Sequence, residues 1–201
     1  EYYSTAMGNG TTASGYYSTA MGYNTTASGI GSTAMGEGTS ASGDYSTAMG
    51  NGTTASGSSS TAMGRSTTAS GSRSTAMGYN TTASGAVSTA MGFGTTASDY
   101  ASLVIGQYNS SGSSVTNNAT SFNTANTAFV IGNGTLGSLS DAFKVMFNGD
   151  TTVSNDLTVS GDVVISSDAR LKSNIVSLGS TISKLLQIDC KSYEMKGKQK
   201  I

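Results

Sequence analysis

The residues that could do chemistry in this chain are few, and their types exclude most active sites. The 201 residues contain no His, so a Ser-His-Asp triad and a His-based zinc site are excluded. The acidic residues Glu37, Asp44 and Asp99 are scattered, which excludes a catalytic carboxylate pair from residues 1–100. The glycines follow a period of seven and lack the Lys-Ser/Thr of a phosphate loop. We therefore expect no metal, no cofactor and no activity on other substrates.

Charge and cysteine content exclude further classes of protein. Charged residues make up 10% of the chain, the formal net charge is −1, and only Arg65 and Arg73 are cationic within residues 1–100. Nucleic acid is therefore not an expected partner. The single Cys190 excludes an internal disulfide framework, and we interpret it as a small apolar residue of a buried segment. No apolar run approaches the roughly 18 to 20 residues of a membrane span.

The elements that must position the side chains follow from two repeated phrases. Ser-Thr-Ala-Met-Gly recurs seven times at a constant spacing, and Thr-Thr-Ala-Ser-Gly follows half a period later, with only Ser40 and Asp99 departing from it. A unit this short cannot bury its own apolar face, so the copies must stack. Apolar residues at helical spacing are absent, whereas Thr-rich heptads that end in Gly are typical of a short strand and a turn. We predict an all-β parallel β-roll of 14-residue coils over residues 1–106, stacked about 4.8 Å apart.

Alternation along each strand assigns the side chains to two faces. Residues two apart share a face, so Ser4 and Ala6 oppose Thr5 and Met7. We interpret the Ala rows as the lining of a narrow roll and the Met row as an apolar stripe outside one sheet. Such a row is typical of a contact with a second copy of the chain; the alternative places Met in the core and Ala outside. The predicted oligomer contacts are Met7, Met21, Met35, Met49, Met63, Met77 and Met91.

These phrases resemble a known family. Ser-x-Ala-x-Gly every seven residues, with a bulky apolar residue before every second Gly, is similar to the head repeat of trimeric autotransporter adhesins, the YadA-like head. The resemblance covers about residues 1–106, with Ser102-Leu103-Val104-Ile105-Gly106 as the terminal coil. It implies a left-handed parallel β-roll and a homotrimer displayed outside a cell or on a virion. Thr-Ala-Met departs from the family, which more often has two β-branched residues there.

The segment after the repeats changes character twice. We interpret residues 107–127, rich in Asn and Ser, as a loop-rich connector. Residues 128–165 are predicted to form a β-rich neck, because alternating apolar runs flank turn signals such as Asn148-Gly149. The neck has too few apolar residues to close a core alone, so we expect it to need partner chains.

The last segment, residues 166–201, is expected to begin with a short helix over about residues 169–186. Ile175, Leu178 and Ile182 have helical spacing, and Ser167 or Asp168 would cap the first turn. The run from Ser167 to Ile175, Ser-Asp-Ala-Arg-Leu-Lys-Ser-Asn-Ile, is similar to the start of the endosialidase-type intramolecular chaperone of phage tail spikes and tail fibres.

That second resemblance implies autoproteolysis. In the family a serine at the junction is the nucleophile and a lysine five residues on is its base, which here are Ser167 and Lys172, with the break between Ser167 and Asp168. A lysine amine activates a hydroxyl when desolvation or a nearby cation lowers its pKa, and Arg170 is close in sequence. Cleavage is expected only in the complete chaperone domain.

Three functional classes remain open from the sequence. The first is a trimeric surface or virion fibre head that binds a cell-surface receptor or glycan, with contacts from variable turn residues. The second is a passive spacer of a tail fibre. The third is an ice-binding β-solenoid. The turn residues of the first class are Tyr16, Tyr17, Tyr23, Arg65, Arg73, Tyr79 and Phe93, and the Thr column of the third is Thr12, Thr26, Thr54, Thr68, Thr82 and Thr96.

Overall fold

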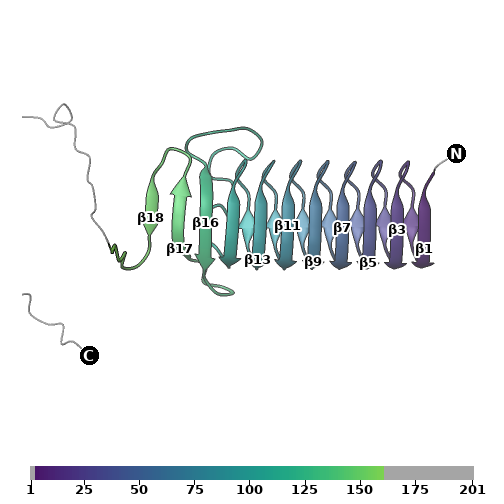
Figure 1. Cartoon of the computed structure of the whole chain (residues 1–201), viewed down its shortest axis with the longest axis horizontal. Helices are drawn as coiled ribbons and strands as arrows, with labels where there is room; N and C mark the ends of the chain where they lie inside the picture. The colour runs from purple at the N-terminus through teal and green to yellow at the C-terminus, as the bar shows by residue number, and fades with distance from the viewer. Residues whose placement is uncertain (1–2, 161–201) are drawn as a thin grey trace, which may run out of the picture. The chain divides into compact units, whose positions relative to one another are not determined.

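The computed structural model describes residues 3–160, and within them every regular element is a β-strand. Residues 1–157 belong to one compact unit; of the second unit, Thr158–Ile201, only residues 158–160 are described. In the first unit the strands of the larger sheet lie side by side in a row from β1 to β18 (Figure 1). The predicted helix, Cys190, Ser167, Arg170 and Lys172 lie outside the described residues.

The coils build two sheets from one long and one short strand each. Sheet A has eleven strands and sheet B has seven, in the order of the chain. Sheet A consists of β1 (Thr5–Asn9), β3 (Thr19–Tyr23), β5 (Thr33–Glu37), β7 (Thr47–Asn51), β9 (Thr61–Arg65), β11 (Thr75–Tyr79), β13 (Thr89–Phe93), β15 (Leu103–Gln107), β16 (Thr127–Asn133), β17 (Asp141–Met146) and β18 (Thr151–Val153). Sheet B consists of β2 (Thr12–Ala13), β4 (Thr26–Ala27), β6 (Ser40–Ala41), β8 (Thr54–Ala55), β10 (Thr68–Ala69), β12 (Thr82–Ala83) and β14 (Thr96–Ala97).

Equivalent residues of successive coils pair in parallel register. Thr47 pairs with Thr61 in sheet A, and Thr54 pairs with Thr68 in sheet B, each one full period apart. The repeat therefore places equivalent side chains above one another throughout both sheets. This confirms the predicted all-β solenoid of 14-residue coils.

The roll has a core of small side chains. The inward Ala residues of both sheets, such as Ala48 and Ala55, have an exposed fraction of 0% from the second coil onward. Inward Ser and Thr residues, such as Ser46 and Thr53, are buried with them. The Met residues lie on the opposite face of sheet A and are half-buried, apart from the exposed Met7. The predicted Ala lining is confirmed, and the alternative with Met in the core is wrong.

The turns between the sheets stack as regularly as the strands. The second residue after each long strand's glycine and the residue before each inward Ser adopt positive φ, for example Asn24 at 50° and Tyr17 at 59°. At the latter position even Val87 has a φ of 62°, which is unusual for a β-branched residue. Hydrogen bonds between coils support this conformation, since the Val87 amide donates to the Ser72 carbonyl at 2.8 Å.

Sheet A continues beyond the last regular coil. Strand β16 pairs in parallel with β15, Leu103 opposite Phe129, so this step along the chain is longer than the regular period. Strands β17 and β18 then add in antiparallel register, and residues 147–150 form the turn between them. The turn indicated by Asn148-Gly149 in the sequence is therefore confirmed, and it belongs to a hairpin.

Candidate functional site

The outward face of sheet A carries the predicted Met contacts in one column. Met21, Met35 and Met49 pair in register, and the same register relates the other Met residues from Met7 to Met91. Thr19 and its equivalents form a second column on this face, and from the second coil onward both columns are half-buried within one chain. Thioether and methyl groups therefore lie side by side along seven coils.

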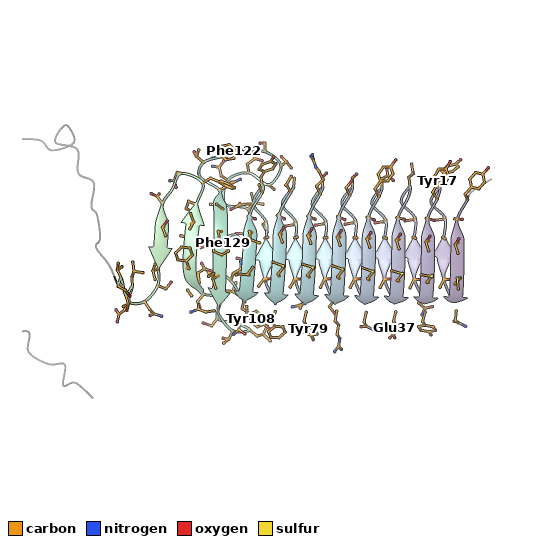
Figure 2. The ribbon with its side chains drawn as sticks, viewed as in Figure 1. Tyr17, Glu37, Tyr79, Tyr108, Phe122 and Phe129 are labelled. Carbon is orange, nitrogen blue, oxygen red and sulfur yellow. The ribbon has the colours of Figure 1, made fainter. Side chains whose placement is uncertain are left out.

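The same face becomes more apolar toward the end of sheet A. The Thr column continues with Leu103, Phe129 and Val145, which pair in that order. Beside it Ile131 pairs with Phe143, whose ring centroid lies 6.0 Å from that of Phe129 in an edge-to-face arrangement. Figure 2 shows Phe129 on the face of the sheet, away from the turns. We call the two outward columns, from β1 to β17, the apolar face.

One edge of the stack carries the residues that end the long strands. Figure 2 shows Glu37, Tyr79 and Tyr108 along this edge. The Arg65 guanidinium lies 5.4 Å from the Tyr79 ring centroid, within the range of a cation–π contact. The Phe93 ring centroid lies 5.1 Å from that of Tyr79 and 4.9 Å from that of Tyr108. Side chains of four successive coils, from Arg65 to Tyr108, are therefore in continuous contact along this edge. Two of the predicted contact residues, Tyr79 and Phe93, are 42% and 40% exposed.

The opposite edge carries the second set of turns. Tyr3 and Tyr17 stack in parallel at 5.7 Å, and Tyr17 is 64% exposed. Tyr16 and Tyr45 are also exposed on this edge. The predicted contact residues therefore divide between two edges, with Tyr16, Tyr17 and Arg73 on one and Tyr23, Arg65, Tyr79 and Phe93 on the other.

The outward face of sheet B carries hydroxyl groups. Thr54, Thr68 and Thr82 pair in register and are half-buried, and the exposed Ser56 and Ser70 lie two residues on in their coils. Ser40 interrupts the Thr column between Thr26 and Thr54. The face is a regular array of Thr and Ser hydroxyls, as the alternation predicted.

The end of sheet B is closed by the segment between β15 and β16. Asp99 is completely buried, and its carboxylate accepts hydrogen bonds from the amides of Thr116 (2.6 Å) and Thr127 (2.8 Å). Asn109 bonds to the backbone of Thr96. This cap was not predicted from the sequence, although the departure of Asp99 from the Gly of its phrase was a signal for it.

Within residues 3–160 the structure contains no group of three or more His, Cys, Asp or Glu side chains suited to a metal ion. The same residues include no helix that is long and apolar enough to cross a membrane. The proposed catalytic pair, Ser167 and Lys172, lies outside this range, and its geometry stays a prediction.

Stacked coils with an Ala lining, an outward Met column and variable turns define a repetitive β-solenoid head. A family model described as "YadA head domain repeat (2 copies)" matches residues 2–25, 27–53, 55–81 and 83–109. These matches cover more than half of the chain, which therefore belongs to the YadA head domain repeat family. No curated protein matched the chain.

Proposed function

We propose that the chain is the head of a homotrimeric surface or virion fibre protein that attaches to a host cell. The apolar face of sheet A is the observation that carries this proposal. It runs without interruption from Met7 through Phe129 to Val145, and its side chains are half-buried or exposed within residues 3–160. Contiguous apolar surfaces of this kind mark interfaces between proteins. Cyclic symmetry lets identical faces meet, and the head repeats favour three chains.

The turns on both edges are the proposed contacts with a receptor or glycan. Trimerisation through the apolar face leaves these edges at the surface. Exposed aromatic rings and Arg side chains on a rigid scaffold supply strong contacts at interfaces. The variable positions occupy turns that the repeated phrases hold in place, so their side chains can differ without changing the coil.

Trimerisation is tested by charging the apolar face. Met35→Lys and Met63→Lys place ammonium groups on the proposed seam, whereas Met35→Leu conserves volume and polarity and is the control. Wild type and the Leu variant should have three times the chain mass by light scattering, and the double Lys variant should be smaller. A folded wild-type monomer, or an unchanged mass of the Lys variant, would contradict the seam.

Adhesion is tested with labelled protein on cultured cells and on a glycan array. Tyr79→Ser and Phe93→Ser together should reduce binding at least tenfold, because they remove two exposed rings. Ser56→Ala on the outer face of sheet B is the matched control and should bind as wild type does. A wild-type head that binds nothing would favour the passive spacer.

We propose, in addition, that the C-terminal segment begins a self-cleaving chaperone that assists trimer assembly. The Ser-Asp-x-Arg-x-Lys phrase from Ser167 to Lys172 supports this role. Ser167→Ala and Lys172→Ala, in a chain that includes the complete chaperone domain, should each abolish cleavage after Ser167. Mass spectrometry of the product identifies the cut, and a cut that persists in either variant excludes the pair.

Ice binding is the second candidate, favoured by the in-register Thr and Ser hydroxyls outside sheet B. A flat array with a regular spacing along two directions can order water. Purified protein should then show thermal hysteresis, and Thr54→Tyr should remove it by interrupting the array. Hysteresis that is absent from wild type, or unchanged by Thr54→Tyr, excludes this candidate.

A further inference from the structure

A polar cavity lies at the end of the roll, where sheet B stops and sheet A continues. The inward column of sheet A passes from Ala90 to Val104 and Val130, and then to Lys144 and Thr152. Strand β14 is the last of sheet B, so within residues 3–160 the inward side of β17 and β18 has no sheet opposite it (Figure 1). A cavity of about 460 Å³ occupies this side, and Lys144 and Thr152 line it.

The lining is rich in hydroxyl and amide groups. Ser110, Ser140 and Thr152 contribute hydroxyls, Asn133 and Asn155 contribute amides, and Leu139 adds one apolar side chain. The volume falls within the range of about 300–1,000 Å³ that is usual for small-molecule sites. Such a wall matches a ligand with several hydroxyl groups and a small C–H surface.

Part of this wall is held in place before any ligand binds. The Asp141 carboxylate accepts hydrogen bonds from the amides of Ser110 and Ser111, both at 2.8 Å. The Ser140 hydroxyl donates to the Asn133 side-chain oxygen at 2.6 Å, and the Ser154 hydroxyl donates to the Asp141 carbonyl. These bonds join the segment after β15 to β17 and the segment after β18.

Lys144 is the charged group of the cavity that has no partner among residues 3–160. The Asp141 carboxylate is stabilised by hydrogen bonds from two backbone amides. The Lys144 ammonium, in contrast, forms no ion pair or hydrogen bond with any residue from 3 to 160. The side chain is half-buried, so an anion beside it is less hydrated than in bulk water. One ammonium matches one carboxylate, because a phosphate dianion would keep an uncompensated charge.

We propose that this cavity binds a carboxylated sugar, with the sugar carboxylate on Lys144, its hydroxyls on the Ser, Thr and Asn groups, and a C–H face against Leu139. The site is distinct from the turn contacts and does not depend on them. It lies on the side of sheet A opposite the apolar face, so trimerisation through that face leaves it accessible.

The test compares two glycosides that differ only in the carboxylate. Methyl β-D-glucuronide should bind to the full chain in saturation-transfer NMR and titration calorimetry, and methyl β-D-glucoside should bind at least tenfold more weakly, because a charged hydrogen bond is lost. Lys144→Met should remove the preference, Lys144→Arg should keep it, and Ser56→Ala, on the outward face of sheet B, should behave as wild type does.

Equal binding of the two glycosides, or of wild type and Lys144→Met, would overturn the proposal, as would no binding of the glucuronide at millimolar concentration. Acetate is the probe for a simple anion site, and displacement of the glucuronide by equimolar acetate would also overturn it. The wild-type comparison does not depend on any variant folding. Failure of this site leaves attachment through the turns intact, and failure of attachment leaves this binding measurable.

Discussion

The side-chain amide of Asn109 pairs with the backbone of Thr96 as a further strand would. Its Oδ1 accepts from the Thr96 amide and its Nδ2 donates to the Thr96 carbonyl, both at 2.8 Å. The same Nδ2 donates to the Ser111 carbonyl at 2.8 Å. Nearby, the Ser98 amide donates to the Gly112 carbonyl. One side chain and one loop thus occupy the edge of β14, where sheet B would otherwise present unpaired backbone groups.

Removal of this side chain should destabilise the end of the roll. Asn109 is 1% exposed, so Asn109→Ala leaves the Thr96 amide and carbonyl without partners in a buried position. We expect a loss of about 2 to 4 kcal/mol in the free energy of unfolding, measured by urea denaturation. Asn109→Asp keeps the acceptor, loses both donated bonds and should also be destabilised. Wild-type stability of the Ala variant would show that water replaces the side chain without cost.

Gly50 should tolerate no side chain, whereas Gly38 should tolerate one. Gly50 has a φ of 124°, and a Cβ there would overlap the Gly64 carbonyl oxygen of the next coil. Gly50→Ala should lower the stability by more than about 3 kcal/mol. Gly38 has a φ of 59° and open space around its Cβ position, so Gly38→Ala should cost only about 1 kcal/mol. Thermal unfolding followed by circular dichroism compares the two, and equal losses would contradict the stacking geometry.

The interior hydroxyls should weaken the roll. The Thr53 side chain is completely buried, and its Oγ1 has no hydrogen-bond partner among residues 3–160. Thr53→Val replaces this oxygen by a methyl group of similar size and should raise the stability by about 1 kcal/mol, seen as a higher midpoint of unfolding. Thr54→Val, the next residue but on the outward face, is the control and should change it by less than about 0.5 kcal/mol. A destabilised Thr53→Val would reveal a bound water or another partner for the hydroxyl.

The roll should tolerate the deletion of a complete 14-residue coil but not of half a coil. Deletion of residues 47–60 joins Ser46 to Thr61 and removes one complete coil, so the chain should fold with a modest loss of stability. Deletion of residues 47–53 joins Ser46 to Thr54 and exchanges the two sheets for every later phrase. That variant should unfold at a much lower temperature or fail to fold. Similar midpoints for the two deletions would contradict a register set by the complete coil.

The repeated phrases predict the coils because each strand pairs with the strand that has the same phrase in the next coil. Ala48 is flanked by Ala34 and Ala62, which are at the same place in the repeat, and the Ala row of sheet B that completes the core belongs to the same repeated unit. Alternation then determines which side chains line the roll and which form the apolar face. Local pattern and tertiary contact coincide here, which is why the solenoid and the position of Met were predictable.

The end of the roll is different because its contacts join segments that share no pattern. Asp99 bonds to Thr127 and Asp141 bonds to Ser110, across sequence separations of 28 and 31 residues. The step from Leu103 to Phe129 breaks the period, although Val-Ile-Gly at both Val104 and Val130 was a signal that β16 repeats β15. The position of Lys144 in a cavity was not predictable from the sequence. It depends on sheet B ending at β14, which leaves the inward side of β17 without a sheet opposite it within residues 3–160.

The direction of the inter-coil hydrogen bonds has a mechanical consequence. They join each coil to the next, so a pull from one end of the stack toward the other loads them in sequence, one coil at a time. Tension should then peel coils singly, with a short, even increase in length at each step, and coils that have not yet detached keep their shape. A head built in this way dissipates an applied force gradually, coil by coil.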